Sequence, residues 1–259
     1  MHLVALVSED ADLNHALRSF RDSADRFHLH PVPKGSTSEL LRSLVRLDFA
    51  GAVVLGEAAQ AEAQRLADRS SLEAQDLGAA DTLTVTPAGI LADHTFGRAV
   101  AAMLAGRRWD AAGAHAVILG ASAKARALAR ELARMGVASL TLLDDDRVAA
   151  ERALPAAAGT SGMARAASDP LALPLLERAD LLVRVSKDAK VDDALLGPHL
   201  TVIDLAQGAR FDLRKRAIEL GALTFSRPEV EAHRFEHALS QVLGGAIGIE
   251  PFRALFQTF

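Results

Sequence analysis

The chain has 259 residues, of which 50% are hydrophobic and 24% are charged, a balance typical of a folded globular protein with a substantial core. Its formal net charge of −4 provides no overall positive charge to attract nucleic acid or an anionic membrane. The absence of cysteine excludes disulfides, thiolate catalysis and cysteine-ligated metals.

The first ten residues, MHLVALVSED, turn acidic after a short apolar run. They have neither a basic start nor a small-residue cleavage site, so we interpret them as a first strand and not as a signal peptide. No apolar run in the sequence approaches the ~20 residues that a membrane span needs. We therefore expect a cytoplasmic protein that has no membrane contact.

Short apolar runs alternate with helical patterns along the first hundred residues. The periods of these runs predict strands at 3–7, 28–33 and 51–55, helices at 11–27, 38–47, 58–70 and 95–105, and a hairpin formed by 81–85 and 89–92. A Gly/Ala-rich connector at 110–113 then marks a predicted domain boundary.

The alternation is sharper after this connector. Strands are predicted at 115–119, 139–143, 181–185 and 201–205, a helix at 123–135, and a surface loop with a short helix at 155–170. Strands that alternate with helices predict a parallel sheet with right-handed crossovers. The expected fold class is therefore α/β.

A glycine turn follows the predicted strand 115–119. The segment Gly120-Ala121-Ser122-Ala123 leads directly into a helix, whose N-terminal N–H groups and dipole suit a pyrophosphate. The Rossmann fingerprint Gly-x-Gly-x-x-Gly/Ala is matched at Gly120 and Ala125. Ser122 departs from it, because a side chain there takes space near the phosphates, although its hydroxyl can donate a hydrogen bond to one of them.

Three acidic residues, Asp144, Asp145 and Asp146, follow the next strand. An acid ~20 residues beyond the glycine turn typically binds the ribose hydroxyls of NAD. Carboxylates there repel a 2′-phosphate, so we expect NAD or NADP as cofactor, with NAD favoured by Asp144. The alternative is a nucleotide-free Rossmann-like fold with an acidic surface turn.

Four blocks, in this order and spacing, resemble the shikimate dehydrogenase family over nearly the whole length of the chain. They are Gly78-Ala79-Ala80-Asp81-Thr82 (family Gly-Ala-x-Asn-Thr), the turn from Gly120 to Ala127 (family Gly-Ala-Gly-Gly-Ala-x-Arg-Ala), the segment from Ala179 to Ser186 (family Ala-Asp-Leu-x-x-Asn-Ala-Thr/Ser), and Val202-Ile203-Asp204-Leu205 (family Val-x-Asp-Val).

The resemblance implies two α/β domains. A substrate-type domain at 1–105 would be completed by the returning segment 231–259, and a Rossmann NAD(P)-binding domain would occupy 106–230. The family's reaction is the reversible NADP-linked reduction of 3-dehydroshikimate to shikimate. In this family pattern Ser186 lies near the nicotinamide ribose.

The chain departs from the family at the positions that carry the chemistry. The family's Lys is missing from the stretch that ends in Ala59-Gln60, and its Asp is replaced by Phe96. Neutral side chains there cannot act as acid or base near neutral pH. The Ser-x-Ser carboxylate clamp is replaced by Ala11-Asp12-Leu13-Asn14, and the C-terminal Gln-Gly site corresponds to His233-Arg234-Phe235.

Several residues remain candidates for a site. His94 is a replacement acid or base, since its pKa suits neutral pH, with a solvated or capping histidine as the alternative. Asp81 and Thr95 are candidates to bind substrate, although Asp is also an ordinary turn residue. His233 and His237 have metal-ligand spacing around Glu236, but a solvated helix face explains them without a third ligand, so no metal is expected.

Two functions remain open from the sequence. The first is a diverged NAD(P)-dependent oxidoreductase, a monomer or homodimer, that acts on a small polyol or hydroxy acid. The second is a catalytically inactive homologue that binds a nucleotide or metabolite or serves as an interaction partner.

Overall fold

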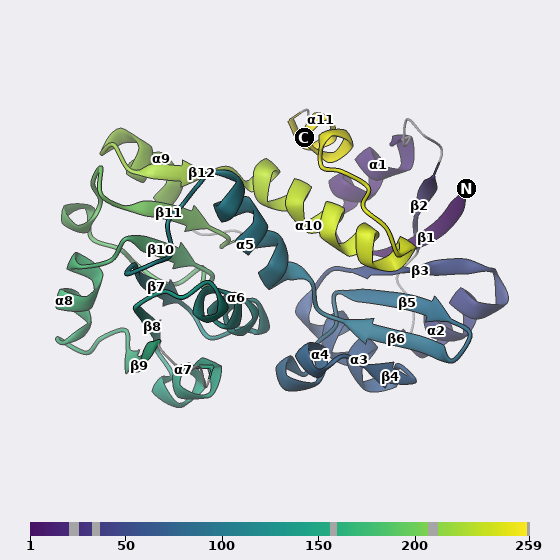
Figure 1. The fold of residues 1–259 in the computed structure, drawn as a ribbon, viewed down its shortest axis with the longest axis horizontal. Helices are drawn as coiled ribbons and strands as arrows, with labels where there is room; N and C mark the ends of the chain where they lie inside the picture. The colour runs from purple at the N-terminus through teal and green to yellow at the C-terminus, as the bar shows by residue number, and fades with distance from the viewer. Residues whose placement is uncertain (21–25, 33–36, 156–159, 207–211, 258–259) are drawn as a thin grey trace. The chain divides into compact units, whose positions relative to one another are not determined.

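The structure is a computed structural model that describes residues 1–20, 26–32, 37–155, 160–206 and 212–257. The chain divides into two compact units, one formed by Met1–Ala99 with Glu231–Phe259 and the other by Val100–Val230. Figure 1 shows the elements of both units in chain order. Within the described ranges, no helix is long and apolar enough to cross a membrane.

The first unit contains a mixed six-stranded sheet in the order β2-β1-β3-β5-β6-β4. Its strands are β1 (His2–Val7), β2 (Phe27–Pro31), β3 (Phe49–Val54), β4 (Arg69–Ser70), β5 (Thr82–Thr86) and β6 (Gly89–Asp93). Strands β1, β2 and β3 are parallel, whereas β5 runs antiparallel to both β3 and β6. The predicted hairpin is thereby confirmed as β5 and β6.

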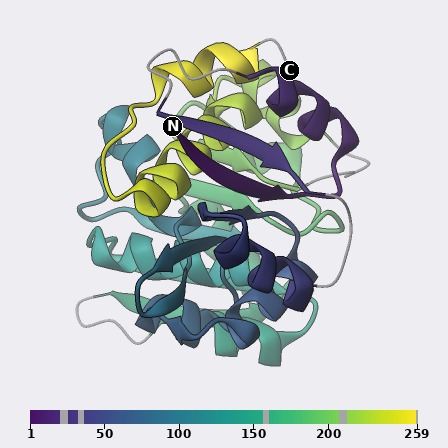
Figure 2. The same cartoon turned by 90° about the vertical axis from the view of Figure 1, so that its right-hand side faces the viewer.

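Alternating side chains of β1 bury both faces of this sheet. Val4 and Leu6 pack with the helices α1 (Ala11–Ser19), α10 (Arg227–Leu243) and α11 (Glu250–Gln257), while Ala5 belongs to a second core on the other face. That second core includes residues of α2 (Thr37–Arg46), α3 (Glu57–Leu66) and α4 (Leu72–Leu77). Figure 2 shows the two C-terminal helices, in yellow, beside the purple N-terminal strands.

The second unit contains a six-stranded sheet in the order β12-β11-β10-β7-β8-β9, and all its strand pairs are parallel. Its strands are β7 (His115–Leu119), β8 (Ser139–Asp144), β9 (Ser161–Ala166), β10 (Leu181–Arg184), β11 (Thr201–Asp204) and β12 (Leu223–Phe225). Numbered within the unit, this is the 3-2-1-4-5-6 order of the Rossmann fold. The predicted α/β class with a Rossmann-like unit is confirmed.

Helices connect the parallel strands of the second unit. They are α6 (Ala123–Arg134), α7 (Arg147–Ala153), α8 (Ala172–Glu177) and α9 (Leu213–Glu219), with a short 3-10 helix, η1 (Asp193–Leu195), before β11. Helix α5 (Phe96–Gly106) passes from the first unit into the second, so the division at Ala99 and Val100 lies inside this helix.

Three sequence predictions of local structure are wrong. The helix expected at 11–27 ends at Ser19, and Phe27 instead begins β2, where its ring contacts Phe252 (residues 21–25 lie outside the described ranges). The helix expected at 58–70 ends at Leu66, because Arg69 and Ser70 pair with β6. The loop expected at 155–170 contains strand β9, although 156–159 are not described.

Candidate functional site

The topology of the second unit places a crevice where two strand ends meet. Strands β7 and β10 are neighbours, and the chain leaves them in opposite directions across the sheet, β7 toward β8 and β10 toward β11. Open α/β sheets bind their ligands at such a switch point, beyond the carboxyl ends of the strands. Gly120 directly follows the end of β7, and Ser186 is the second residue after the end of β10.

Gly120 is required by the geometry of this turn. Its φ of +113° is strained for other residues, and a Cβ built on it would lie 2.9 Å from the backbone nitrogen of Ser186. The turn is fixed from both sides, since Gly120 N–H donates to the carbonyl of Leu143 and Ser186 N–H donates to the carbonyl of Leu119. Gly120 and Ser186 therefore form a closely packed backbone cradle, in which there is no room for a side chain at Gly120.

Ser122 is the N-cap of α6, and its hydroxyl accepts a hydrogen bond from Ala125 N–H at 3.5 Å. Ala125 is fully buried, which explains why a small residue is needed at this position of the turn. The serine that breaks the glycine fingerprint thus helps to hold the start of the helix. The N-terminal end of α6 and its positive dipole remain at the switch point together with Ala121 and Ala123.

The three acidic residues after β8 have different roles. Asp146 caps α7 by accepting from the N–H groups of Val148 and Ala149, and Asp145 is exposed. Asp144 is half-buried at the end of β8, where one carboxylate oxygen accepts from Asp146 N–H at 2.9 Å. Because β8 is the neighbour of β7, Asp144 lies at the position from which a Rossmann acid contacts ribose.

A buried ion pair links the ends of β10 and β11. Arg184 is 1% exposed, and its guanidinium donates two hydrogen bonds to Asp204, from Nε at 2.9 Å and from Nη2 at 2.5 Å. The sequence analysis missed this pair, because it considered Arg184 only as part of the block from Ala179 to Ser186. The sequence did contain a signal for this pair, namely a charged residue inside an apolar strand and an acid at the matching position of the next strand.

Asp81 in the first unit holds the start of α5. Its carboxylate accepts from the N–H groups of Thr95 at 2.7 Å and Phe96 at 2.9 Å, and from the hydroxyl of Thr82 at 2.9 Å. Burial alone would raise the pKa of Asp81, but the electrostatic effects of His94 and Arg234 and the hydrogen bonds from Thr95 and Thr82 hold it below its usual value. The position predicted to bind substrate therefore contains a charged group that is already engaged by backbone.

His94 is enclosed by protein. Its side chain is 0% exposed, and Nδ1 lies 3.8 Å from a carboxylate oxygen of Asp81, too far for a hydrogen bond. Within the described residues neither ring nitrogen has a hydrogen-bond partner. Burial lowers the pKa of His94, and the nearby Asp81 opposes this shift without reversing it. We therefore expect a neutral imidazole at pH 7.

The depressed pKa of His94 predicts a loss of stability in mild acid. The unfolded chain takes up a proton at this residue below about pH 6.5 whereas the folded chain does not, so the free energy of unfolding falls as the pH falls. For one such group, the free energy of unfolding falls by up to ~1.4 kcal/mol for each unit by which the pH is lowered. Urea unfolding between pH 7.5 and 5.5 measures it, and His94→Gln is expected to flatten the dependence. An unchanged slope in the variant would contradict the assignment.

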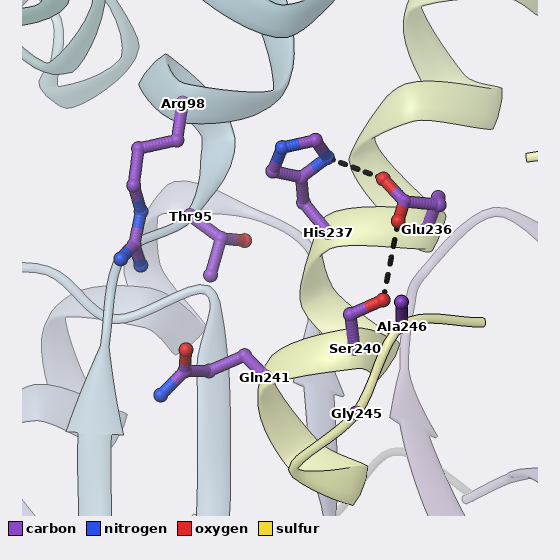
Figure 3. Close-up of a pocket in the computed structure, with 8 residues that line it drawn as sticks. All are labelled: Thr95, Arg98, Glu236, His237, Ser240, Gln241, Gly245 and Ala246. Atoms are coloured by element: carbon purple, nitrogen blue, oxygen red, sulfur yellow. Dashed lines mark hydrogen bonds and ion pairs between the residues drawn. The ribbon is translucent and has the colours of Figure 1, made fainter. Parts of the chain in front are cut away.

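A pocket of about 350 Å³ lies in the first unit, beside Thr95 at the start of α5 (Figure 3). It is lined by Thr95 and Arg98 near the start of α5, by Glu236, His237, Ser240 and Gln241 of α10, and by Gly245 and Ala246. Thr95, predicted to bind substrate, is thus part of the lining, whereas Asp81 and His94 are buried.

Two ion pairs border this pocket. Nδ1 of His237 lies 2.6 Å from a carboxylate oxygen of Glu236, and Nη2 of Arg98 donates to Asp93 at 2.5 Å. Figure 3 shows the His237 ring projecting from α10 toward the segment that carries Thr95 and Arg98. The described residues contain no group of three or more potential ligands that could hold a metal ion.

The sequence analysis centred the C-terminal site on His233-Arg234-Phe235. Arg234 and Phe235 are instead buried, with the Arg234 guanidinium 5.7 Å from the ring centre of Phe96. His237 and Gln241 line the pocket, one and two helical turns beyond His233. The spacing of four between these residues was the available signal, because it places them on one face of the helix.

The positions of the family's missing Lys and Asp are also in the interior. Gln60 is 1% exposed, and its amide donates to the carbonyl of Val54 at 2.9 Å. Phe96 is 2% exposed and packs against Arg234. Neither side chain can exchange a proton near pH 7.

No protein-family model and no curated protein sequence gives a significant match to the chain. Solved structures do match over the whole length. They include shikimate 5-dehydrogenase from Listeria monocytogenes in complex with shikimate and NAD (14% identity, 98% of this chain and 96% of that chain, TM-score 0.83). They also include quinate dehydrogenase from Corynebacterium glutamicum in complex with NAD (19%, 100% and 99%, TM-score 0.83) and 5-ketofructose reductase of Gluconobacter sp. strain CHM43 (17%, 100% and 98%, TM-score 0.78).

These likenesses establish the fold. The chain has the fold of shikimate and quinate dehydrogenases, and the resemblance expected from the sequence blocks is confirmed at that level. At identities of 14 to 19%, the chemistry must be argued from this chain's own residues.

Proposed function

We propose that this chain is an oxidoreductase that uses a nicotinamide dinucleotide to convert a small hydroxylated molecule. The backbone cradle at Gly120 carries the proposal, because it lies at the switch point of a sheet with Rossmann strand order and has glycine where a side chain would collide with Ser186. Structures of the same fold contain NADP+ or NAD.

In this proposal the segment Gly120-Ala121-Ser122-Ala123 holds the pyrophosphate at the start of α6. Asp144 binds the adenosine ribose, and Ser186 lies beside the nicotinamide ribose. The carboxylates at the end of β8 disfavour a 2′-phosphate, so NAD is preferred to NADP. When bound, the dinucleotide supplies the hydride acceptor or donor, while the chain contributes orientation and the exclusion of water.

Calorimetric titration with NADH and NADPH tests this assignment. We expect NADH to bind more tightly than NADPH, and Asp144→Ala to weaken NADH binding about tenfold, which corresponds to ~1.4 kcal/mol. Glu177→Gln, which neutralises an exposed carboxylate on α8 of the same unit, is the matched control and should leave both affinities unchanged. Absence of binding by either nucleotide would exclude the proposed function.

The second candidate is an inactive homologue that binds a nucleotide or metabolite. It is favoured by Gln60 and Phe96, which place neutral, buried side chains where the family has its proton-transfer residues. Incubation of the protein with NADH and NAD and a panel of ketones and polyols, including shikimate and quinate, separates the two candidates. Nucleotide binding without turnover of any member of the panel would support the inactive homologue.

A further inference from the structure

The cationic groups that line the pocket of the first unit are each matched by a carboxylate. Arg98 donates to Asp93 at 2.5 Å, and His237 contacts Glu236 at 2.6 Å. Ser240 donates to the other oxygen of Glu236 at 3.2 Å, which helps to fix this carboxylate. The lining therefore presents charge that is already compensated inside the protein.

The surroundings of Arg98 add negative charge beyond its direct partner. Asp93, Glu73 and Asp81 all act electrostatically on this guanidinium, and together they raise the pKa of Arg98 although burial opposes the shift. A ligand carboxylate placed beside Arg98 would approach these three acids as well. Like charges at short range in a partly buried site are unfavourable, so the pocket disfavours an anionic ligand.

Neutral hydrogen-bonding groups are directed into the same space. Gln241 extends from α10 toward Arg98, and the His237 ring presents Nε2 on the side away from Glu236 (Figure 3). An amide and an imidazole both donate and accept, as hydroxyl groups do. A ligand that carries several hydroxyl groups satisfies them without introducing a charge.

The pairing of His237 with Glu236 also orients the imidazole. Nδ1 faces two acceptors, the Glu236 carboxylate at 2.6 Å and the carbonyl oxygen of His233 at 3.2 Å, which favour the tautomer in which Nδ1 carries a proton. Nε2 is left as the nitrogen that exchanges a proton with a ligand. Such carboxylate–imidazole pairs serve as general acids and bases when the ring reaches a substrate hydroxyl. His237 is thus the ionisable group of this pocket that is placed for proton transfer.

We propose that this pocket takes a neutral polyhydroxylated ligand and that His237, held by Glu236, exchanges the proton of one ligand hydroxyl. The proton-transfer half of the inference rests on the proposed oxidoreductase function. If an oxidised nicotinamide dinucleotide accepted the hydride from the carbon that bears this hydroxyl, the hydroxyl proton would pass to Nε2 of His237 and the alcohol would become a ketone. The imidazolium would then release the proton to water.

Ligand charge is tested on the protein without nucleotide. Two matched probe pairs, myo-inositol against quinate and sorbitol against gluconate, differ chiefly in a carboxylate. Histidine side-chain resonances, with those of His237 identified by comparison with His237→Gln, report binding. We expect the neutral member of at least one pair to shift the His237 resonances and to bind at least tenfold more tightly than its anionic partner.

The variant Asp93→Asn tests whether the preference for a neutral ligand can be weakened. This change keeps an oxygen for the N–H of His94 and for Ser71, but it leaves Arg98 without its direct carboxylate partner. We expect the anionic member of each pair to gain affinity at least fivefold in the variant. Tighter binding of quinate or gluconate by the unaltered protein, or no response of His237 to any probe, would overturn the proposal.

The role of His237 has a spectroscopic readout of its own. A carboxylate-bound Nδ1 proton is expected as a slowly exchanging low-field imidazole resonance that disappears in Glu236→Gln. With a polyol that is turned over, His237→Gln should lower the rate at least 100-fold while the KM for NAD stays unchanged. If nucleotide binding fails while the polyol preference holds, the oxidoreductase proposal and the proton-transfer step fall and the ligand assignment of the pocket stands. The reverse result removes only the pocket assignment.

Discussion

Replacement of Asp81 by alanine is expected to lower the free energy of unfolding by about 3–5 kcal/mol. The change removes the acceptor for the N–H groups of Thr95 and Phe96 at the start of α5 and for the hydroxyl of Thr82. It also removes one of the negative charges near Arg234, which is 5% exposed and keeps Glu231 at 3.6 Å. Chemical denaturation followed by circular dichroism measures the loss.

Two further variants separate the causes. Asp81→Asn keeps one oxygen as an acceptor but removes the charge, so we expect a loss of about 2–3 kcal/mol, between the alanine variant and the unaltered protein. Asp12→Ala removes an exposed acid from the first turn of α1 and should change stability by no more than ~0.5 kcal/mol. If Asp81→Ala unfolds like the unaltered protein while ligand binding is lost, Asp81 is a ligand contact, as the sequence had indicated.

The Rossmann unit was predictable because its signals are local. A buried strand, a glycine turn and a helix occupy consecutive residues around Gly120, and the acid at Asp144 follows at a fixed distance. Such patterns are readable without knowledge of the tertiary fold. The hairpin of β5 and β6 is similar, since its short turn follows two apolar runs directly.

Strand β9 was missed for the opposite reason. Its six residues, SGMARA, are small or polar and alternate weakly in burial, and their pairing partner β8 is about twenty residues earlier in the chain. An edge strand covered on one side only does not need a hydrophobic period. Only the register with β8 identifies it, and that register is a tertiary property.

The pocket shows a second limit of the sequence. His237 and Glu236 are adjacent in the chain, but the pocket that they line is completed by Thr95 and Arg98, which are more than 130 residues away. The sequence comparison placed the family's C-terminal site at His233-Arg234-Phe235, on the same helix that lines this pocket. It also noted that the family's Lys and Asp are replaced, and Gln60 and Phe96 at those positions lie in the interior.

The buried pair of Arg184 and Asp204 carries the other large expected effect. Asp204→Ala should lower the free energy of unfolding by about 3–5 kcal/mol, because it leaves the charge of a 1% exposed guanidinium without its carboxylate partner. Replacement of both residues by apolar ones of similar volume, Arg184→Met with Asp204→Leu, should recover most of this loss. Urea unfolding of Arg184→Met, Asp204→Leu and the double variant gives the coupling energy directly.

The same set of variants also tests whether the pair of Arg184 and Asp204 has a structural or a functional role. Arg184 precedes Ser186 by two residues, and Ser186 closes the cradle at Gly120. If the pair serves only to fix the end of β10, the double variant regains NADH binding together with stability. A double variant that is stable but no longer binds NADH would mean that the charges themselves act at the switch point. Additive losses in stability would instead show that the two side chains do not interact in solution, contrary to the bidentate geometry.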